Sequence, residues 1–386
     1  MRGNATTAVL WVAVLGATTS SAGEIEFRKG IPADPNFFPI GVWLQSPRRA
    51  EEYRRIGINT YVALWKGPTA EQLDALDRAG MKVVCRQDER FLDRGSIIAW
   101  MHDDEPDNAQ ALPDGKGYGP PIAPSKIVEG YRKLRMVDPD RPVFLNLGQG
   151  VANDRYVGRG VRTGHLEDYR EYLEGCDIGS FDIYPVSHTD RAIRGNLWYV
   201  SKGVERLREW SGGRKPIWCC IETTGISDPT VRPTPSQVES EVWLALIHGA
   251  EGIIYFAHQF RPTFIEAGLL ADSKITEAVR SVNDRIRELA PVLRSPTIRG
   301  SITAVGSDPD VPVATMVKRH GGATYVFAIT TRPGTTVVEF DSKSTASSIE
   351  VVGSKELPKI EKGRWTDRLS DQRVRIYRIV SGAEPR

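Results

Sequence analysis

The sequence predicts a (β/α)8 barrel, an α/β fold of the TIM type, followed by a small C-terminal antiparallel β-sandwich. Three observations support this fold class. Eight short apolar runs recur before residue 257, amphipathic segments separate most of them, and alternating apolar and polar residues begin near Ser295. Runs that are apolar on both faces are typical of parallel strands covered on both sides. A doubly wound open sheet shares this local pattern, and the count of eight favours the barrel.

The predicted elements of the barrel alternate along the chain. The strands are expected at 38–44, 60–65, 82–86, 97–102, 142–147, 178–183, 216–221 and 252–256. Amphipathic periodicity predicts helices over 70–80, 125–136, 165–173, 198–210, 236–248 and 274–293. Ser125 is the expected N-cap of the second helix. The connection between the third and fourth strands is short, and a helix there is doubtful.

The C-terminal part changes to the two-residue period of half-buried strands. Strands are expected at 314–318, 324–329, 337–340, 348–352 and 374–379. The chain therefore divides into a signal peptide over residues 1–22, a catalytic barrel over 23–294 and a β-sandwich over 295–386.

The first residues have the pattern of an export signal. Arg2 precedes the apolar run 8–17, which is too short to span a bilayer, and Ser20-Ser21-Ala22 fits a cleavage site. An uncleaved anchor or a chance apolar start is the alternative. No later stretch has the length and apolarity of a membrane span. We expect a secreted or periplasmic protein.

Composition limits the class of partner. The formal net charge is +2 and charges of both signs are mixed, which argues against nucleic acid and anionic membranes and suits a neutral carbohydrate. No glycine-rich phosphate loop, dinucleotide fingerprint or His-x-His pair is present, so no cofactor and no metal are expected. Four cysteines (Cys85, Cys176, Cys219 and Cys220) permit one or two disulfides, and buried free thiols are favoured. The oligomeric state stays open.

Two glutamates stand at the ends of predicted strands. Glu105 follows the fourth strand and Glu222 follows the seventh. The carboxyl ends of barrel strands meet at one mouth, where barrel enzymes place their chemistry. Two carboxyls facing each other across that mouth could cleave a glycosidic bond, one as acid and the other as nucleophile or base. The alternative is that each carboxyl belongs to a simple turn or helix cap.

Further residues near strand ends are candidates for substrate contacts. Sugar rings stack on aromatic rings, for which Trp43, Trp65, Trp100 and Tyr255 are candidates. Polar candidates for hydroxyl contacts are Asp104, Asp182, Tyr184, Asn146, His102 and Gln259. Each ring by itself is more typical of core packing, and each histidine of a structural role. Several such residues at one mouth favour a binding site.

Local segments resemble a known group. Phe181-Asp182-Ile183-Tyr184-Pro185 and the passage from Leu244 to Phe256 are similar to segments of β-galactosidase-like proteins, as is the helix segment from Arg285 to Leu293. These proteins belong to the largest clan of retaining glycoside hydrolases, which share the barrel fold. The resemblance implies that Glu105 is the acid/base, Glu222 the nucleophile, and Tyr184 a hydrogen-bond partner of the nucleophile. It implies hydrolysis of a neutral oligo- or polysaccharide by double displacement.

One position departs from the clan. The residue before the acid/base is usually Asn and here is Asp104. A carboxylate there could still accept a hydrogen bond from a sugar hydroxyl, and it would raise the pKa of Glu105 by repulsion. The departure also keeps open a non-catalytic glycan-binding barrel that has lost hydrolysis. A lyase or isomerase that uses the same carboxylates is a third reading.

Overall fold

The computed structural model describes residues 27–343, 346 and 348–380. The expected signal peptide at residues 1–22 lies outside these described residues. Among the helices that are described, none combines the length and the apolarity that crossing a membrane requires.

The first part of the chain is a closed barrel of eight parallel strands, as the sequence predicted. Its strands are β1 Ile40–Trp43, β2 Thr60–Val62, β3 Lys82–Arg86, β4 Ile97–Asp104, β5 Val143–Leu147, β6 Ile178–Phe181, β7 Ile217–Glu222 and β8 Gly252–Phe256. Strands β1 and β8 close the barrel by parallel pairing of Ile40 with Ile253. Strand β4 ends two residues later than expected and β7 ends one residue later, so Asp104 and Glu222 are the last residues of their strands.

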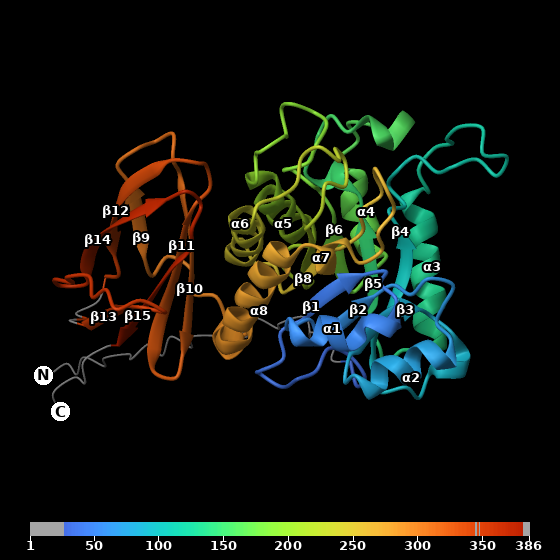
Figure 1. Cartoon of the computed structure of the whole chain (residues 1–386), viewed down its shortest axis with the longest axis horizontal. Coiled ribbons are helices and arrows are strands. Elements are labelled where there is room, and N and C mark those ends of the chain that lie inside the picture. The colour runs from blue at the N-terminus through green and yellow to red at the C-terminus, as the bar shows by residue number, and fades with distance from the viewer. Residues whose placement is uncertain (1–26, 344–345, 347, 381–386) are drawn as a thin grey trace, which may run out of the picture.

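Helices surround the barrel (Figure 1). They are α1 Ala50–Arg55, α2 Ala70–Arg78, α3 Pro124–Val137, α4 Asp168–Glu174, α5 Trp198–Trp210, α6 Pro235–Ile247, α7 Gly268–Ala271 and α8 Ser273–Leu293. Thr69 and Thr234 begin α2 and α6 with capping boxes, which satisfy amide groups of the first turn. The doubtful connection between β3 and β4 holds only the short 3₁₀ helix η2, Glu89–Phe91.

Two helix expectations need correction. Ser125 is not the N-cap of α3, because the helix begins at Pro124, whose fixed φ and missing N–H suit the first turn. Helix α1 was not predicted, since its six residues are too few to establish a helical period.

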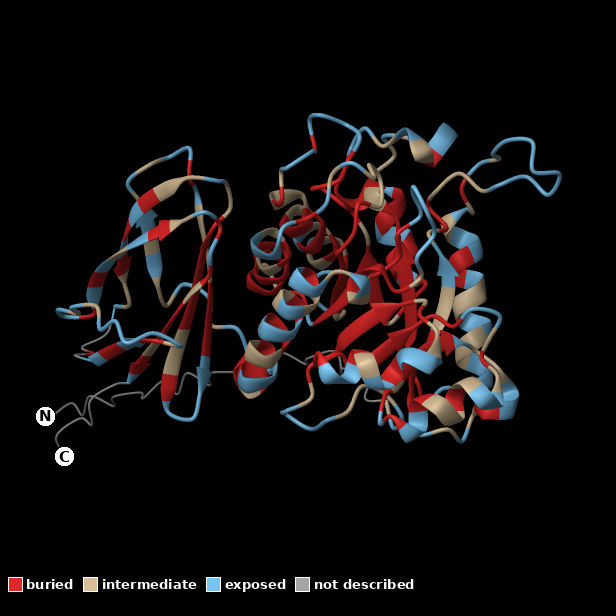
Figure 2. Ribbon diagram, viewed as in Figure 1, coloured by how far each residue is buried: buried red, intermediate tan, exposed pale blue. Residues whose placement is uncertain are grey.

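The barrel interior is filled by side chains rather than open. Trp218 of β7 packs edge-on against Phe144 of β5, with ring centroids 5.5 Å apart. Gly252 of β8 makes room for this indole, because a Cβ at that position would lie 2.7 Å from the Trp218 ring. The packed interior closes the barrel below its C-terminal mouth, so any site has to lie at the mouth. Figure 2 shows the barrel strands as buried.

The C-terminal part is a sandwich of two antiparallel sheets, which confirms the predicted fold class. One sheet has the order β10–β11–β15–β13 and the other β14–β12–β9. The bounds are β9 Thr303–Gly306, β10 Val313–His320, β11 Ala323–Thr330, β12 Thr335–Asp341, β13 Ser348–Val351, β14 Arg364–Ser370 and β15 Arg375–Val380. Between the two sheets Phe340 stacks on Trp365, and the ring of Tyr377 packs at an angle against both. Strands β9 and β14 were not predicted, since exposed and charged residues interrupt their apolar alternation.

The sandwich packs on α6 and α8 (Figure 1). Trp243 of α6 stacks on Phe327 of β11 at 6.0 Å between ring centroids. The hydroxyl of Ser240 in α6 donates a 2.9 Å hydrogen bond to the carbonyl of Gln372. Both aromatic rings are fully buried, so the barrel and the sandwich share one apolar layer.

Candidate active site

A cavity of about 290 Å³ opens at the C-terminal ends of the barrel strands. Residues from β1, β4, β5, β7 and β8 and from the loops that follow β5, β6 and β7 surround it. The lining residues are Trp43, Asp104, Glu105, Asn146, Gln149, Asp182, Tyr184, Cys220, Ile226, Ser227 and Phe256. Six of the twelve residues expected at the site line this cavity, namely Trp43, Asp104, Glu105, Asn146, Asp182 and Tyr184.

An irregularity at the end of β4 brings two consecutive acidic residues into this cavity. Neighbouring residues of a regular strand point to opposite faces. The pairing of β4 with β5 shifts between Met101 and Asp104, and Glu105 has a left-handed backbone with φ 45°. The amide of Glu105 is fixed by a 2.9 Å hydrogen bond to the carbonyl of Asn146. Left-handed non-glycine residues are uncommon and cluster at functional sites, so this geometry marks Glu105.

The carboxyl groups of Glu105 and Asp182 lie within hydrogen-bonding reach of each other. Burial, followed by the charge of Asp182, raises the pKa of Glu105, so Glu105 holds a proton at neutral pH. Burial also raises the pKa of Asp182, while hydrogen bonds from Glu105 and Tyr184 hold it below that of Glu105. The pair therefore consists of one protonated and one ionised carboxyl.

Asp104 is a third carboxyl at the same mouth. Its Oδ1 accepts a 3.1 Å hydrogen bond from the side-chain amide of Asn146. Withdrawal from bulk water raises the pKa of Asp104 to about 7, and the charge of Asp182 adds to the shift. Asp104 and Asn146 present an acceptor and an amide side by side, a pair suited to binding sugar hydroxyls.

The structure buries Glu222, the second glutamate that was expected at the mouth. The side chain of Glu222 is 0% exposed and is not part of the cavity lining. Its Oε1 accepts from the amide of Val186 at 2.5 Å, and its Oε2 accepts from the amide and hydroxyl of Ser187 at 3.1 and 2.9 Å. These donors belong to the loop after β6 and hold the carboxylate away from solvent.

A second buried carboxyl, Glu241 of α6, contacts Glu222. Its side chain is also 0% exposed. Burial, followed by the charge of Glu222, raises the pKa of Glu241 well above its usual range. Neither carboxyl oxygen of Glu241 has a hydrogen-bond partner among the described residues, whereas Glu222 accepts from three donors. Burial raises the pKa of Glu222 to about 7, and its carboxyl joins the end of β7 to the loop after β6.

Three aromatic candidates lie outside the cavity. Trp100 and Tyr255 are 0% exposed. The indole N–H of Trp100 donates to Asp138 at 2.8 Å, and the hydroxyl of Tyr255 donates to Asn283 at 2.8 Å, so both belong to the core between strands and helices. Trp65 is 68% exposed on the loop after β2 and does not line the cavity.

Two polar candidates have structural roles instead of lining the cavity. Nε2 of His102 lies 3.0 Å from the carbonyl of Ile127, and its Nδ1 accepts from the amide of Asp103 at 2.6 Å. The side-chain amide of Gln259 donates to the carbonyl of Thr263 at 3.1 Å within the loop after β8.

The sequence analysis missed five lining residues. Cys220 and Phe256 could have been found by strand alternation, because Trp218 and Cys220 share the interior face of β7 and Phe256 ends β8. Gln149, Ile226 and Ser227 lie on irregular loops, where no period signals their direction.

The thiols and the acidic residues form no metal or disulfide centre in the described part of the chain. All four cysteines are buried and free, as favoured from the sequence. Within residues 27–343, 346 and 348–380, no group of three or more His, Cys, Asp or Glu side chains is arranged to hold a metal ion.

Comparison with known proteins gives the fold. No protein-family model matches the sequence, and no curated protein is similar to it. An α-amylase from Geobacillus thermoleovorans complexed with acarbose is 11% identical over 89% of this chain and 98% of its own, with a TM-score of 0.54. A candidate α-galactosidase from Bacteroides fragilis is 10% identical over 89% of this chain and 79% of its own, with a TM-score of 0.55.

An α-amylase from Anoxybacillus is 10% identical over 92% of this chain and 100% of its own, with a TM-score of 0.52. At such identities the likeness concerns the course of the backbone. The chain has the same overall fold as these structures.

Proposed function

We propose that this protein is a glycoside hydrolase for neutral glycans and that Glu105 and Asp182 are its catalytic carboxyls. The observation that carries the proposal is the contact of these two carboxyls, from the ends of β4 and β6, in an open cavity at the barrel mouth. Barrel enzymes place their chemistry at this face, and glycosidic bonds are cleaved between two carboxyls.

Glu105 takes the role of acid. Its raised pKa keeps a proton available for the leaving-group oxygen at neutral pH. Asp182, which ionises first, takes the place that the sequence analysis gave to Glu222. Glu222 is excluded from contact with substrate by its burial in this conformation.

We propose that the reaction retains the anomeric configuration. Carboxyls within hydrogen-bonding reach are closer than the roughly 6.5–9.5 Å found in inverting enzymes, and a substrate needs to part them only to about 5 Å for retention. The Asp182 carboxylate forms a bond to the anomeric carbon while the bond to the leaving oxygen breaks and that oxygen takes the Glu105 proton. Water then gives its proton to Glu105, attacks the same carbon and releases Asp182.

The remaining lining residues fit a neutral sugar. Asp104, Asn146 and Gln149 offer acceptors and amides for hydroxyl groups, and Trp43 and Phe256 offer rings for the C–H faces of a pyranose. The ionised Asp182 and the partly ionised Asp104 would repel an anionic sugar. Two α-amylases and a candidate α-galactosidase among proteins of the same fold support a carbohydrate substrate.

We also propose export, from the leader pattern of residues 1–22. Expression of the full chain followed by N-terminal sequencing of the exported protein tests this. A mature N-terminus near Gly23 is expected, and retention of Met1 on the exported protein contradicts it.

Screening for hydrolysis of neutral oligosaccharides and aryl glycosides tests the function. Glu105→Gln is expected to lower turnover by about 10²–10⁴-fold, since it removes the acid. Asp103→Asn is the matched control, because Asp103 precedes this segment on the same strand but is not part of the cavity lining. Equal activity of Glu105→Gln and the control would reject the assignment of Glu105.

Azide separates the two possible nucleophiles. In Asp182→Ala, azide should enter the vacated space, restore part of the turnover and give a glycosyl azide of inverted configuration. In Glu222→Ala, azide should restore nothing, because the vacated space is sealed below the cavity. If azide restores turnover in Glu222→Ala but not in Asp182→Ala, the nucleophile is Glu222 and the assignment to Asp182 is wrong. Binding of glycans by the wild type without any hydrolysis would select the non-catalytic glycan-binding barrel.

A further inference from the structure

A series of aromatic rings runs from the cavity to the protein surface. Tyr184 contacts Phe256 with centroids 5.2 Å apart, and Phe256 contacts His258 at 5.3 Å and Phe260 at 6.2 Å. Phe264 continues the series, 6.0 Å from Phe260 and 6.1 Å from His258. We name Phe256, Phe260 and Phe264 the ring strip. One end of the strip lines the cavity and the other lies on the loop after β8.

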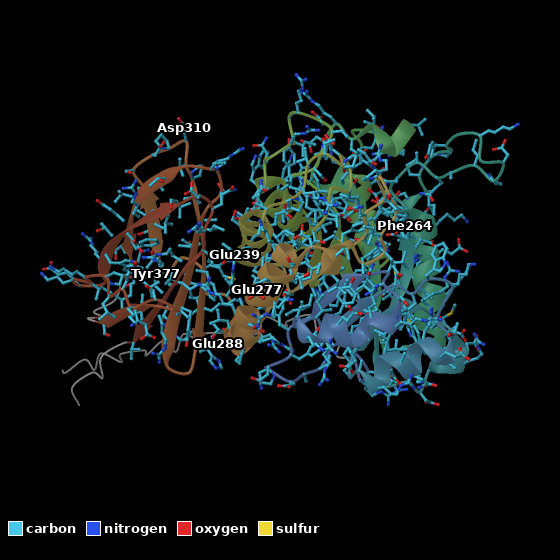
Figure 3. The ribbon with its side chains drawn as sticks, in the orientation of Figure 1. Glu239, Phe264, Glu277, Glu288, Asp310 and Tyr377 are labelled. Carbon is cyan, nitrogen blue, oxygen red and sulfur yellow. The ribbon has the colours of Figure 1, made fainter. Side chains whose placement is uncertain are left out.

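The two outer rings of the strip are exposed to solvent. Phe260 is 48% exposed and Phe264 is 59% exposed. Phe264 lies on the side of the barrel that faces away from the sandwich (Figure 3). Adjacent exposed phenylalanines beside a cavity are more informative than scattered ones, because contiguous apolar surface marks binding sites.

The loop that carries these rings is held in shape. Gln259 and Ile265 exchange two backbone hydrogen bonds of 2.9 Å, which makes the loop a small hairpin. The guanidinium of Arg261 at its tip donates to the carbonyl of Ser227, a cavity-lining residue, at 3.1 Å. The rings are therefore presented in a fixed arrangement, which lowers the entropy cost of binding.

The cavity alone is small for a glycan chain. Its volume of about 290 Å³ is at the lower end of the range of ligand pockets, which is roughly 300–1,000 Å³. A chain of several sugars with one unit at Glu105 and Asp182 has to continue outside the cavity. The ring strip is the apolar surface that begins at the cavity wall, and the flat C–H faces of pyranose rings are complementary to it.

We infer that the ring strip is an extended binding site for the sugar units of a neutral oligosaccharide chain whose reacting unit occupies the cavity. This inference rests on the proposed function and adds to it a preference for chains over single glycosides. The occupant is a glycan chain because the strip is continuous with the carboxyl-bearing cavity, where a sugar makes its polar contacts.

The test measures how affinity depends on chain length. The full chain carrying Glu105→Gln, which should bind without hydrolysis, is titrated calorimetrically. The probes are α-1,4-glucan, β-1,4-glucan, β-1,4-xylan and β-1,4-galactan oligosaccharides of two to six units. Phe260→Ala and Phe264→Ala are added singly to this background. The control is Tyr118→Ala, which removes a 76% exposed ring from the loop after β4. Thermal unfolding checks that each variant is folded.

Each ring variant should weaken the binding of five- and six-unit chains about tenfold, which corresponds to about 1.4 kcal/mol. Binding of the two-unit probe should change less than about twofold, and the control should bind every probe as the background does.

Equal weakening for two-unit and six-unit probes, or no weakening at all, overturns the inference and leaves the proposed function standing. Binding of no probe in any of the four series overturns the proposed function and this inference together. A change in oligomeric state on ultracentrifugation, with unchanged sugar binding, would assign the strip to contact between copies of the chain and also overturns the inference.

Discussion

Replacing Glu241 with Gln should make the protein more stable at neutral and alkaline pH. Glu241 and Glu222 are both fully buried and interact electrostatically, and the raised pKa of Glu241 keeps a proton on that carboxyl at neutral pH. A glutamine amide can donate to the Glu222 carboxylate without taking up a proton. The three hydrogen bonds that Glu222 accepts from Val186 and Ser187 remain.

The size of the effect follows from proton linkage. In the unfolded chain Glu241 titrates near 4.5, and burial raises its pKa well above that value in the folded protein. Between these two pH values folding takes up a proton, so the free energy of unfolding falls as pH rises, by about 1.4 kcal/mol per pH unit for one proton. At pH 7 the cost for the wild type is about 3 kcal/mol, which the glutamine variant avoids because it takes up no proton.

Urea unfolding at pH 5, 6, 7 and 8 measures this effect. The free energy of unfolding of Glu241→Gln should fall less steeply with pH than that of the wild type. The two slopes should differ by about 1.4 kcal/mol per pH unit, which corresponds to one proton. Buried carboxyls that do not interact with Glu241 are common to both proteins and cancel in the difference, whereas Glu222 interacts with Glu241 and contributes to it. Glu239→Gln is the control on the same helix, since the side chain of Glu239 is 45% exposed (Figure 3). Parallel pH profiles for Glu241→Gln and the wild type would refute the reasoning.

Three further outcomes are expected. Asp138→Asn removes the carboxylate that lies 2.6 Å from the buried guanidinium of Arg141, and the free energy of unfolding should fall by about 3–5 kcal/mol; an unchanged urea midpoint would contradict this. Asn283→Ala removes the acceptor of the buried Tyr255 hydroxyl and should lower the free energy of unfolding by about 1–3 kcal/mol. Part of this loss should be regained when Tyr255→Phe is added, because no hydroxyl is then left without a partner. Hydrolysis by the wild type should decline at alkaline pH as Glu105, whose pKa is raised by burial, loses its proton; retention of that alkaline limb in the residual activity of Glu105→Gln would contradict the assignment.

The barrel could be predicted because its signals are local. Each strand is a short apolar run, and seven of the eight predicted runs begin at or within one residue of the observed strand. Capping residues such as Thr69 and Thr234 mark helix starts within a few residues of sequence. Strand β14 was missed because Asp367 takes the inward position between the buried Trp365 and Leu369 and so interrupts the apolar alternation.

The site could be predicted only in part, because its final geometry depends on distant contacts. Glu105 and Asp182 follow β4 and β6 directly, and their place at the mouth could be predicted because the apolar runs and the number of strands show where each strand ends. No glycine or proline lies between Met101 and Asp104, where the pairing becomes irregular, so its effect on Glu105 could not be foreseen. Glu222 is held by donors 35 and 36 residues away in the chain, and no local pattern indicates such a contact.

The stacking of Trp243 on Phe327 has a consequence for modular use of the barrel. Trp243 is on the helix between β7 and β8, and its ring has no exposed surface while the sandwich is in place. A barrel excised at the end of α8 would present this indole and the apolar face around it to water. The two parts should therefore melt together in a single calorimetric transition, and grafting the barrel into another protein would require a substitute for the sheet that covers it.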